Sequence, residues 1–203
     1  MPPQSSAIAR GIRQDAQDPR SRKTRADLLR AFFALALSRR YHEIRITDVL
    51  LASGVAKSTF YEHFSGKDAL LAASMEGPLG VLAGLVDDSR DVVEVAAILA
   101  HFHENGTLAR SLFQGPAARV VREALVAEVE ARLRPAQRAR LRLPPRLAAH
   151  ALAEGLLAPV IAWLRGEAAC TAAVLASGLA ASIAGMRDAL LVGGAGDAGG
   201  VVA

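Results

Sequence analysis

Pairs of histidine and carboxylate side chains are the first candidates for chemistry, because such pairs bind metals or transfer protons. His101 and His103 lie next to Glu104, and His150 precedes Glu154 by four residues. Residues two apart in a helix point in different directions, so His101 and His103 cannot share one ligand site. No HExxH motif or cysteine pair accompanies them, and a His–Glu pair at i, i+4 is typical of a helix interface or a pocket wall. The sequence therefore predicts no catalytic residue, no metal site and no cofactor.

Positive charge is concentrated in the first third of the chain. Residues 1–75 carry 12 Lys and Arg against 7 Asp and Glu, a balance of +5, whereas residues 76–203 carry 12 against 13, a balance of −1. The three lysines, Lys23, Lys57 and Lys67, all fall in the first part. This division is typical of a polyanion-binding module joined to a nearly neutral domain, although a solvated basic face would give the same count.

The elements that would position these basic residues are helical. Apolar residues recur at helical spacing from Arg22 to Ser38, which predicts one long helix. Two short helices follow, Thr47–Ser53 and Lys57–Phe64, and Gly54 between them suits the left-handed turn that ends a helix. Two short helices joined by a glycine turn and preceded by a longer helix describe a helix-turn-helix.

The second short helix would supply base contacts. A helix-turn-helix places the start of its second helix at the base edges of the major groove. There Lys57 would donate to the O6 or N7 atom of guanine, and Ser58 would contact several bases. Residues 1–20 are expected to form a disordered basic arm that reaches a neighbouring minor groove.

The residues of this motif resemble one known family. The run SGVAKSTFYEHFSGKDALL, with the preceding RKTRADLLRAFFALALSRRYHEIRITDVLLA, resembles the signature of the TetR family over about residues 22–71. The resemblance implies a dimeric repressor that binds a palindromic operator in double-stranded DNA and holds a small molecule in its C-terminal domain. It also implies phosphate contacts from Thr59, Tyr61 and His63. Lys67, at the start of the next helix, suits the same role.

Two positions depart from the family pattern. Ala56 stands where the family usually has Ser, so the second short helix lacks a side-chain N-cap, a loss of about 1 kcal/mol. Arg45 lies near the place where many members have a Thr that caps the first short helix and touches phosphate. Thr47 is the nearest substitute, and Arg45 itself suits a phosphate.

Composition favours an all-α fold. Hydrophobic residues make up 52% of the chain and aromatic residues 4%, and the apolar residues are mostly Ala, Leu and Val. Ala and Leu favour helix. We expect a three-helix DNA-binding domain at residues 21–72, a larger helical ligand-binding and dimerisation domain at 73–192, and a flexible tail at 193–203. The glycine- and proline-containing stretch at 77–84 is expected to hinge or kink the connection.

The C-terminal domain is expected to bind a small, apolar effector. The pocket candidates are the larger side chains of the middle helices, although each apolar one would serve equally well in an ordinary core. These candidates are Phe102, Leu112, Phe113, Glu154 and Trp163.

The last two predicted helices, Pro145–Leu164 and Thr171–Leu191, are the candidates for a homodimer interface. Small residues at spacings of three and four would let helices approach closely. On the last helix these residues are Gly178, Ala181, Ser182 and Gly185; Leu147, Ala151, Ala158 and Ile161 form a comparable stripe on the other.

Two other classes of protein stay open from the sequence alone. Ala168–Met186 is 19 residues long without a formal charge, close to the length that spans a bilayer. It consists largely of Ala, Ser and Gly, whose transfer into lipid is weak, so a buried helix is favoured over a membrane anchor. A helical enzyme is the second alternative, which a metal analysis and a turnover screen would have to support. The single Cys170 and an N-terminus without an apolar run fit a cytoplasmic protein.

Overall fold

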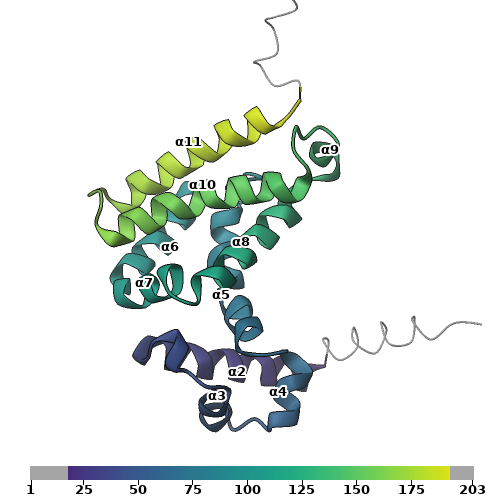
Figure 1. Cartoon of the computed structure of the whole chain (residues 1–203), viewed down its shortest axis with the longest axis vertical. Helices are drawn as coiled ribbons and strands as arrows, with labels where there is room; N and C mark the ends of the chain where they lie inside the picture. Colours follow the sequence, from purple (N-terminus) through teal and green to yellow (C-terminus); the bar gives the residue numbers. More distant parts are fainter. Residues whose placement is uncertain (1–17, 193–203) are drawn as a thin grey trace, which may run out of the picture. The chain divides into compact units, whose positions relative to one another are not determined.

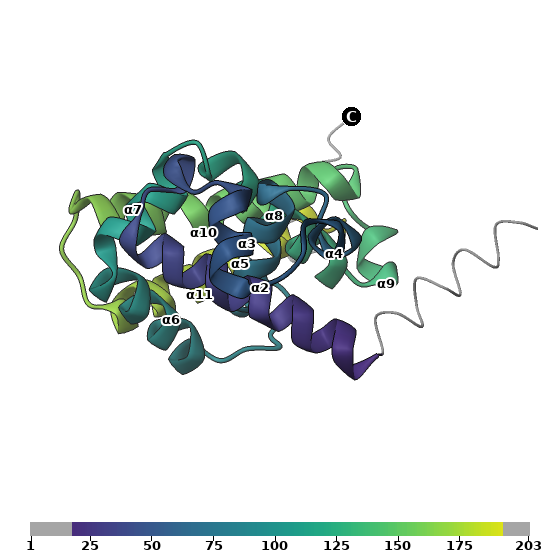
Figure 2. The ribbon, with the colours of Figure 1, turned by 90° about the horizontal axis from the view of Figure 1, so that it is seen from below.

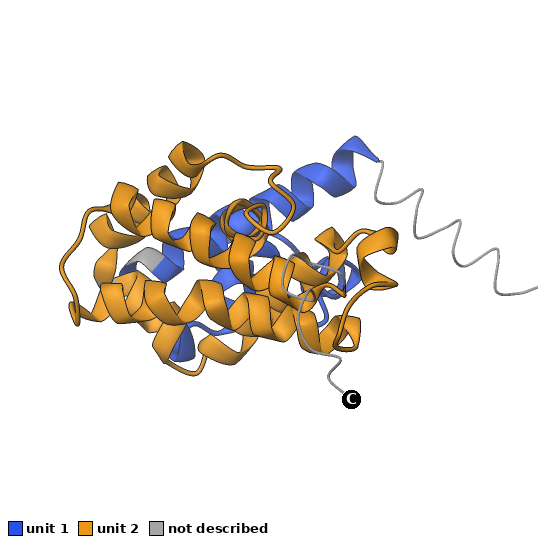
Figure 3. Ribbon diagram, turned by 90° about the horizontal axis from the view of Figure 1, so that it is seen from above, with its two compact units in different colours: residues 1–74 blue, residues 75–203 orange. Residues whose placement is uncertain are grey.

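The computed structural model of the protein describes residues 18–192. Within this range it contains ten α-helices and no strand, which confirms the all-α prediction. An isolated antiparallel bridge joins Leu141 to Leu191. The chain divides between Ser74 and Met75 into two compact units (Figure 3).

The first unit is built around a long helix, α2 (Pro19–Ser38), which packs against α3 (Ile46–Ser53). A short 3-10 helix, η1 (Tyr41–Glu43), connects them, and α4 (Lys57–His63) follows after a turn (Figures 1 and 2). Large side chains of α2, η1, α3 and α4, and of the residues that follow η1 and α4, are fully or almost fully buried and form much of the core. They are Leu28, Phe32, Tyr41, Ile44, Val49, Phe60 and Phe64.

The second unit is built around α10 (Pro145–Arg165), which packs against four other helices (Figure 1). Nine of its residues are buried, and their spacing places them on one half of the helix circumference, so that the other half is left outward. The surrounding helices are α6 (Val92–Glu104), α7 (Gly106–Gln114), α8 (Ala118–Arg132) and α11 (Ala172–Leu190), and a single turn, α9 (Pro135–Arg138), precedes α10.

Capping residues fix several helix ends. Asp91 accepts a hydrogen bond from the backbone N–H of Glu94 at 2.8 Å, and Thr171 accepts one from Val174 at 3.2 Å. Gly54 and Gly166 end their helices with φ values of +69° and +78°, in the left-handed region that favours glycine. These side chains start α6 and α11, and the two glycines end α3 and α10.

Two expectations about the connecting segments differ from the structure. The stretch at 77–84, where a hinge or kink is expected, lies largely inside one helix: α5 runs from Lys67 to Ala83 with Pro78 inside it. Leu79, Leu82 and Ala83 are fully buried, so tertiary packing outweighs the breaker residues. The first long helix begins at Pro19, with Asp18 as its N-cap, rather than at Arg22. The rest of the expected arm, residues 1–17, and the expected tail, residues 193–203, lie outside the described residues.

Candidate nucleic-acid interface

The turn between α3 and α4 has the geometry of a helix-turn-helix. Gly54 adopts φ +69°, and its N–H donates to the carbonyl of Leu50 at 2.9 Å. The N–H of Val55 donates to the hydroxyl of Ser53 at 3.3 Å. On the inner side of α4, Phe60 is fully buried and its ring centroid lies 5.9 Å from that of Phe64. The polar residues of α4 are therefore left on its outer side.

The start of α3 is held by Asp48. Arg45 is the N-cap residue, and its backbone N–H donates to the Asp48 carboxylate at 2.9 Å. The guanidinium of Arg39 lies 3.5 Å from the same carboxylate. Asp48 thus supplies the capping function that the sequence suggested for Thr47. The side chains of Arg45 and Thr47 are both exposed.

The outer side of α4 carries polar residues that differ in how far their side chains are exposed. Lys57 and Ser58, at its start, are exposed, and Ala56 before them gives no side-chain cap, as the sequence indicates. Thr59 and His63 are half-buried. Tyr61 is 49% exposed, and its ring packs edge-on against Phe60 at 5.2 Å.

Lys67 is placed differently from the other predicted contacts. Its ammonium donates to the carbonyl of Tyr41 at 3.0 Å and to that of Ile44 at 2.9 Å. It also lies 4.3 Å from the centroid of the Tyr41 ring. Tyr41 in turn donates its hydroxyl proton to the carboxylate of Asp68. An ammonium has three N–H groups, so two of those on Lys67 already have partners inside this unit.

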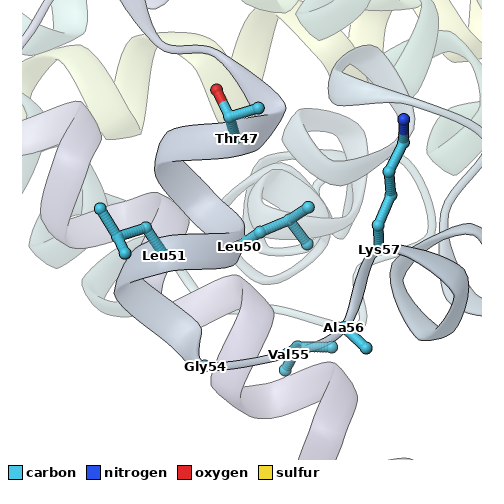
Figure 4. A pocket seen from close by; sticks show the side chains of 7 residues that line it. All are labelled: Thr47, Leu50, Leu51, Gly54, Val55, Ala56 and Lys57. Atoms are coloured by element: carbon cyan, nitrogen blue, oxygen red, sulfur yellow. The ribbon is translucent and has the colours of Figure 1, made fainter.

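An open hollow lies between α3 and α4 (Figure 4). Leu51, on its wall, is 88% exposed. Sequence reasoning did not single this residue out. Val49, Leu50, Leu51 and Ala52 are consecutive apolar residues, and a helix with 3.6 residues per turn cannot direct all of them inward. That run is the signal by which an exposed apolar side chain could have been found.

The predicted effector-pocket residues belong to the core of the second unit. Phe102, Leu112, Phe113 and Trp163 are all at least nine-tenths buried. The rings of Phe102 and Phe113 lie 5.2 Å apart, and Trp163 lies 4.8 Å from His103. The Trp163 indole N–H donates to the carbonyl of Cys170 at 2.9 Å. These contacts bring together residues of α6, α7 and α10.

Glu154 has an internal partner. Its carboxylate accepts a hydrogen bond from the guanidinium of Arg122, which links α10 to α8. A second link comes from Arg146, which pairs with Glu123 at 2.6 Å and Glu130 at 3.0 Å. In residues 18–192, no three His, Cys, Asp or Glu side chains are grouped so as to hold a metal ion.

Comparison with known proteins finds a family similar to the first unit. Residues 28–74 match the model of the family described as "Bacterial regulatory proteins, tetR family". The chain is 27% identical over 94 residues to the HTH-type dhaKLM operon transcriptional activator DhaS of Lactococcus lactis subsp. lactis (strain IL1403). That alignment covers 44% of this chain and 49% of the relative, so the chain spans about half the length of the curated relative it matches.

Solved structures show the same fold over most of the chain. A TetR transcriptional regulator from Streptococcus agalactiae 2603V superimposes with a TM-score of 0.51 and 22% identity, covering 88% of this chain and 98% of that one. A TetR-family regulator from Syntrophomonas wolfei str. Goettingen gives 0.51 and 16%, covering 85% and 98%. The likeness therefore extends beyond the DNA-binding unit to the helices of the second unit.

Proposed function

We propose that this chain is a DNA-binding transcriptional regulator of the TetR family, whose model residues 28–74 match. It acts as a homodimer on a palindromic operator, under the control of a small apolar effector. Family and fold are those of regulators rather than enzymes. The observation that carries the proposal is the exposed start of α4, where Lys57 and Ser58 follow a left-handed turn.

The DNA contacts divide into two kinds. Lys57 and Ser58 read base edges, because the start of the second helix of such a motif enters the major groove. Arg45, Thr47, Thr59, Tyr61 and His63 hold phosphates, which fixes the register without reading sequence. The partial exposure of Thr59, Tyr61 and His63 supports this role, since part of each side chain stays open to a phosphate.

The dimer uses the outward sides of α10 and α11. All four small residues expected there on α11 are exposed, and a Cβ added at Gly178 or Gly185 would meet nothing within 4 Å. On α10, Leu147 and Ala158 are exposed. Two such helices from each subunit would form a four-helix bundle about a twofold axis. Small residues let the helices approach closely, so such an interface buries apolar surface without large side chains.

Both helices are also long and apolar enough to cross a membrane by length and composition. Half of the apolar window of α10 is buried within the protein, which favours a core helix. We propose that the outward side of α11 faces a second subunit in the cytoplasm rather than lipid. A dimer that purifies without detergent supports this assignment, and a requirement for detergent contradicts it.

The effector is proposed to bind among α6, α7 and α10, beside Phe102, Leu112, Phe113 and Trp163. Ligand binding there would favour a conformation in which the two recognition helices no longer match half-sites about 34–36 Å apart. The expected direction is release, as in a repressor, whereas the relative DhaS is named an activator. A reporter gene under the selected operator decides the direction.

The test is selection of bound duplexes from a random DNA pool, followed by affinity measurement with variants. A palindromic consensus is expected. Lys57→Ala should weaken binding by about 1–3 kcal/mol and relax preference at one base pair of each half-site. Lys23→Ala, which removes an exposed lysine of α2, is the matched control and should leave base preference unchanged. Unaltered preference in Lys57→Ala would show that this residue does not read bases.

A further inference from the structure

The hollow between α3 and α4 has a volume of about 550 Å³. Its lining is mainly apolar, with polar residues at two positions. In Figure 4, Leu50 points from α3 toward the side of Lys57, and Leu51 points to the opposite side of the helix. The lining side chains are Thr47, Leu50, Leu51, Val55, Ala56 and Lys57.

Leu51 contributes little to the core of its own unit. Val49 fills the inward side of α3 and is fully buried, whereas Leu51 is 88% exposed. A single exposed leucine is ordinary on a protein surface. Leu51, however, lines the same hollow as Leu50, Val55 and Ala56.

The position of this surface indicates which molecule would cover it. Thr47 and Leu51 are four residues apart on α3 and therefore lie on one side of it. Lys57, on the other rim, is one of the residues assigned above to base contact. A docked duplex that reaches both Thr47 and Lys57 would cover the hollow between them. On the base edges of the major groove, the apolar group is the C5-methyl of thymine.

We propose that this hollow receives thymine methyl groups and that Leu51 is a specificity-determining residue for operator DNA. The proposal rests on the proposed function. The one cationic lining residue, Lys57, and the +5 balance of residues 1–75 match a polyanion carrying the methyl groups rather than an apolar protein surface.

The test uses the duplex recovered by selection, with each thymine replaced in turn by deoxyuridine. This replacement keeps the base-pairing edge and removes only the methyl group. With the unaltered protein, at least one position in each half-site should bind about fourfold more weakly, the value of one buried methyl group. In Leu51→Ala the same replacement should have no effect. Val93→Ala is the matched control, because Val93 is also an exposed aliphatic residue, 76% exposed on α6, and it should keep the fourfold loss.

Three results would overturn the proposal, and they are distinguishable. If no thymine shows methyl dependence, or if Leu51→Ala keeps it, the hollow does not read methyl groups. If Leu51→Ala changes the sedimentation coefficient of the protein without DNA, the hollow is a protein contact. If the unaltered protein selects no duplex, the proposed function fails together with the proposal. Because Leu51 is so exposed, the alanine variant should fold as the unaltered chain does.

Discussion

The ammonium of Lys67 is enclosed by one short segment of chain. Two carbonyls, of Tyr41 and Ile44, accept its N–H groups, and the ring of Tyr41 lies beside it. Asp68, the next residue, accepts the hydroxyl proton of Tyr41. The first turn of α5 is therefore fastened to the segment that leads into α3. A lysine in this position stabilises the recognition unit whether or not it also approaches DNA.

Replacing Lys67 by methionine separates the two roles. Lys67→Met should lower the free energy of unfolding by about 2 kcal/mol, since hydrogen bonds from a charged donor are lost and two carbonyls lose their partner. The slope of log affinity against log salt should stay unchanged, because no phosphate contact is removed. Denaturant unfolding and binding at several salt concentrations measure the two quantities.

Lys57→Met is the control for this variant. Lys57 is exposed, so its loss should leave the free energy of unfolding within about 0.5 kcal/mol of the unaltered value. A decrease of about 0.9 in the salt slope for Lys67→Met, with unchanged stability, would instead make Lys67 a phosphate contact.

Residue types alone could not show where the Lys67 side chain points. The sequence indicates a lysine at the start of a helix beside a DNA-binding motif, and such a lysine suits a phosphate. Its actual partners lie 23 and 26 residues earlier in the chain. A contact of that kind depends on how η1 folds against α5, which no local pattern encodes. Exposure of Lys57 and burial of Phe60, by contrast, follow from helical periodicity and were predictable.

At the scale of elements, α11 differs from the other helices in what it leaves uncovered. Its inward side buries Ala176, Leu179 and Ile183, and α10 approaches it closely where a Cβ on Gly155 would lie 3.0 Å from Met186. Its outward side carries Gly178 and Gly185, which face open space. Gly155 of α10 thus serves packing within the subunit, whereas Gly178 and Gly185 of α11 are free to pack against a helix of another subunit.

Gly178→Gln tests the dimer without disturbing the subunit. The added side chain meets nothing in the subunit and improves helix propensity, so the fold should be retained. A closely packed interface should lose its fit, and sedimentation should show a shift from dimer to monomer. Gly178→Ala is the control and should remain dimeric. A dimer that tolerates glutamine at this position would place the interface elsewhere.

Helix ends were more predictable than helix continuity. Thr171 and Gly54 carry their signals in a single side chain or in the absence of one. The helices that they bound were predicted as Thr171–Leu191 and Thr47–Ser53 and are observed as Ala172–Leu190 and Ile46–Ser53. The continuity of α5 was not predictable, because Gly77 and Pro78 are local breakers. Burial of Leu79 and Leu82 against distant residues overrides them. Tertiary contacts decide whether a helix continues through such residues, and a short stretch of sequence does not reveal those contacts.

At the scale of the whole molecule, Arg187 joins segments about a hundred residues apart. Its guanidinium donates to the carbonyl of Val86 at 3.1 Å and to the carboxylates of Asp88 at 2.9 Å and Asp188 at 3.3 Å. Partial burial lowers the pKa of Arg187, but the hydrogen bonds and charges of Asp88 and Asp188 outweigh it and raise that pKa above its ordinary value. The stabilisation is therefore complete below the unfolded pKa and is lost only as pH rises through the folded one.

Arg187→Met should lower the free energy of unfolding by about 1–2 kcal/mol. Charged hydrogen bonds are lost, but Asp88 and Asp188 are exposed, so solvent screens part of the interaction. Arg165→Met is the matched control: Arg165 is exposed and pairs only locally with Glu167 at 3.4 Å, so its loss should change stability by less than about 0.5 kcal/mol. Equal effects of the two substitutions in thermal or denaturant unfolding would show that the long-range contact adds nothing.

The proline inside α5 removes one backbone hydrogen bond from this helix. Pro78 has no N–H, so the carbonyl of Ser74, four residues earlier, cannot receive the usual helical hydrogen bond. Ser74 is also the last residue of the first compact unit. The hydrogen bond missing from α5 thus lies at the boundary at which the chain passes from one unit to the next. Because the donor is absent from a covalent ring, neither pH nor salt can restore this hydrogen bond.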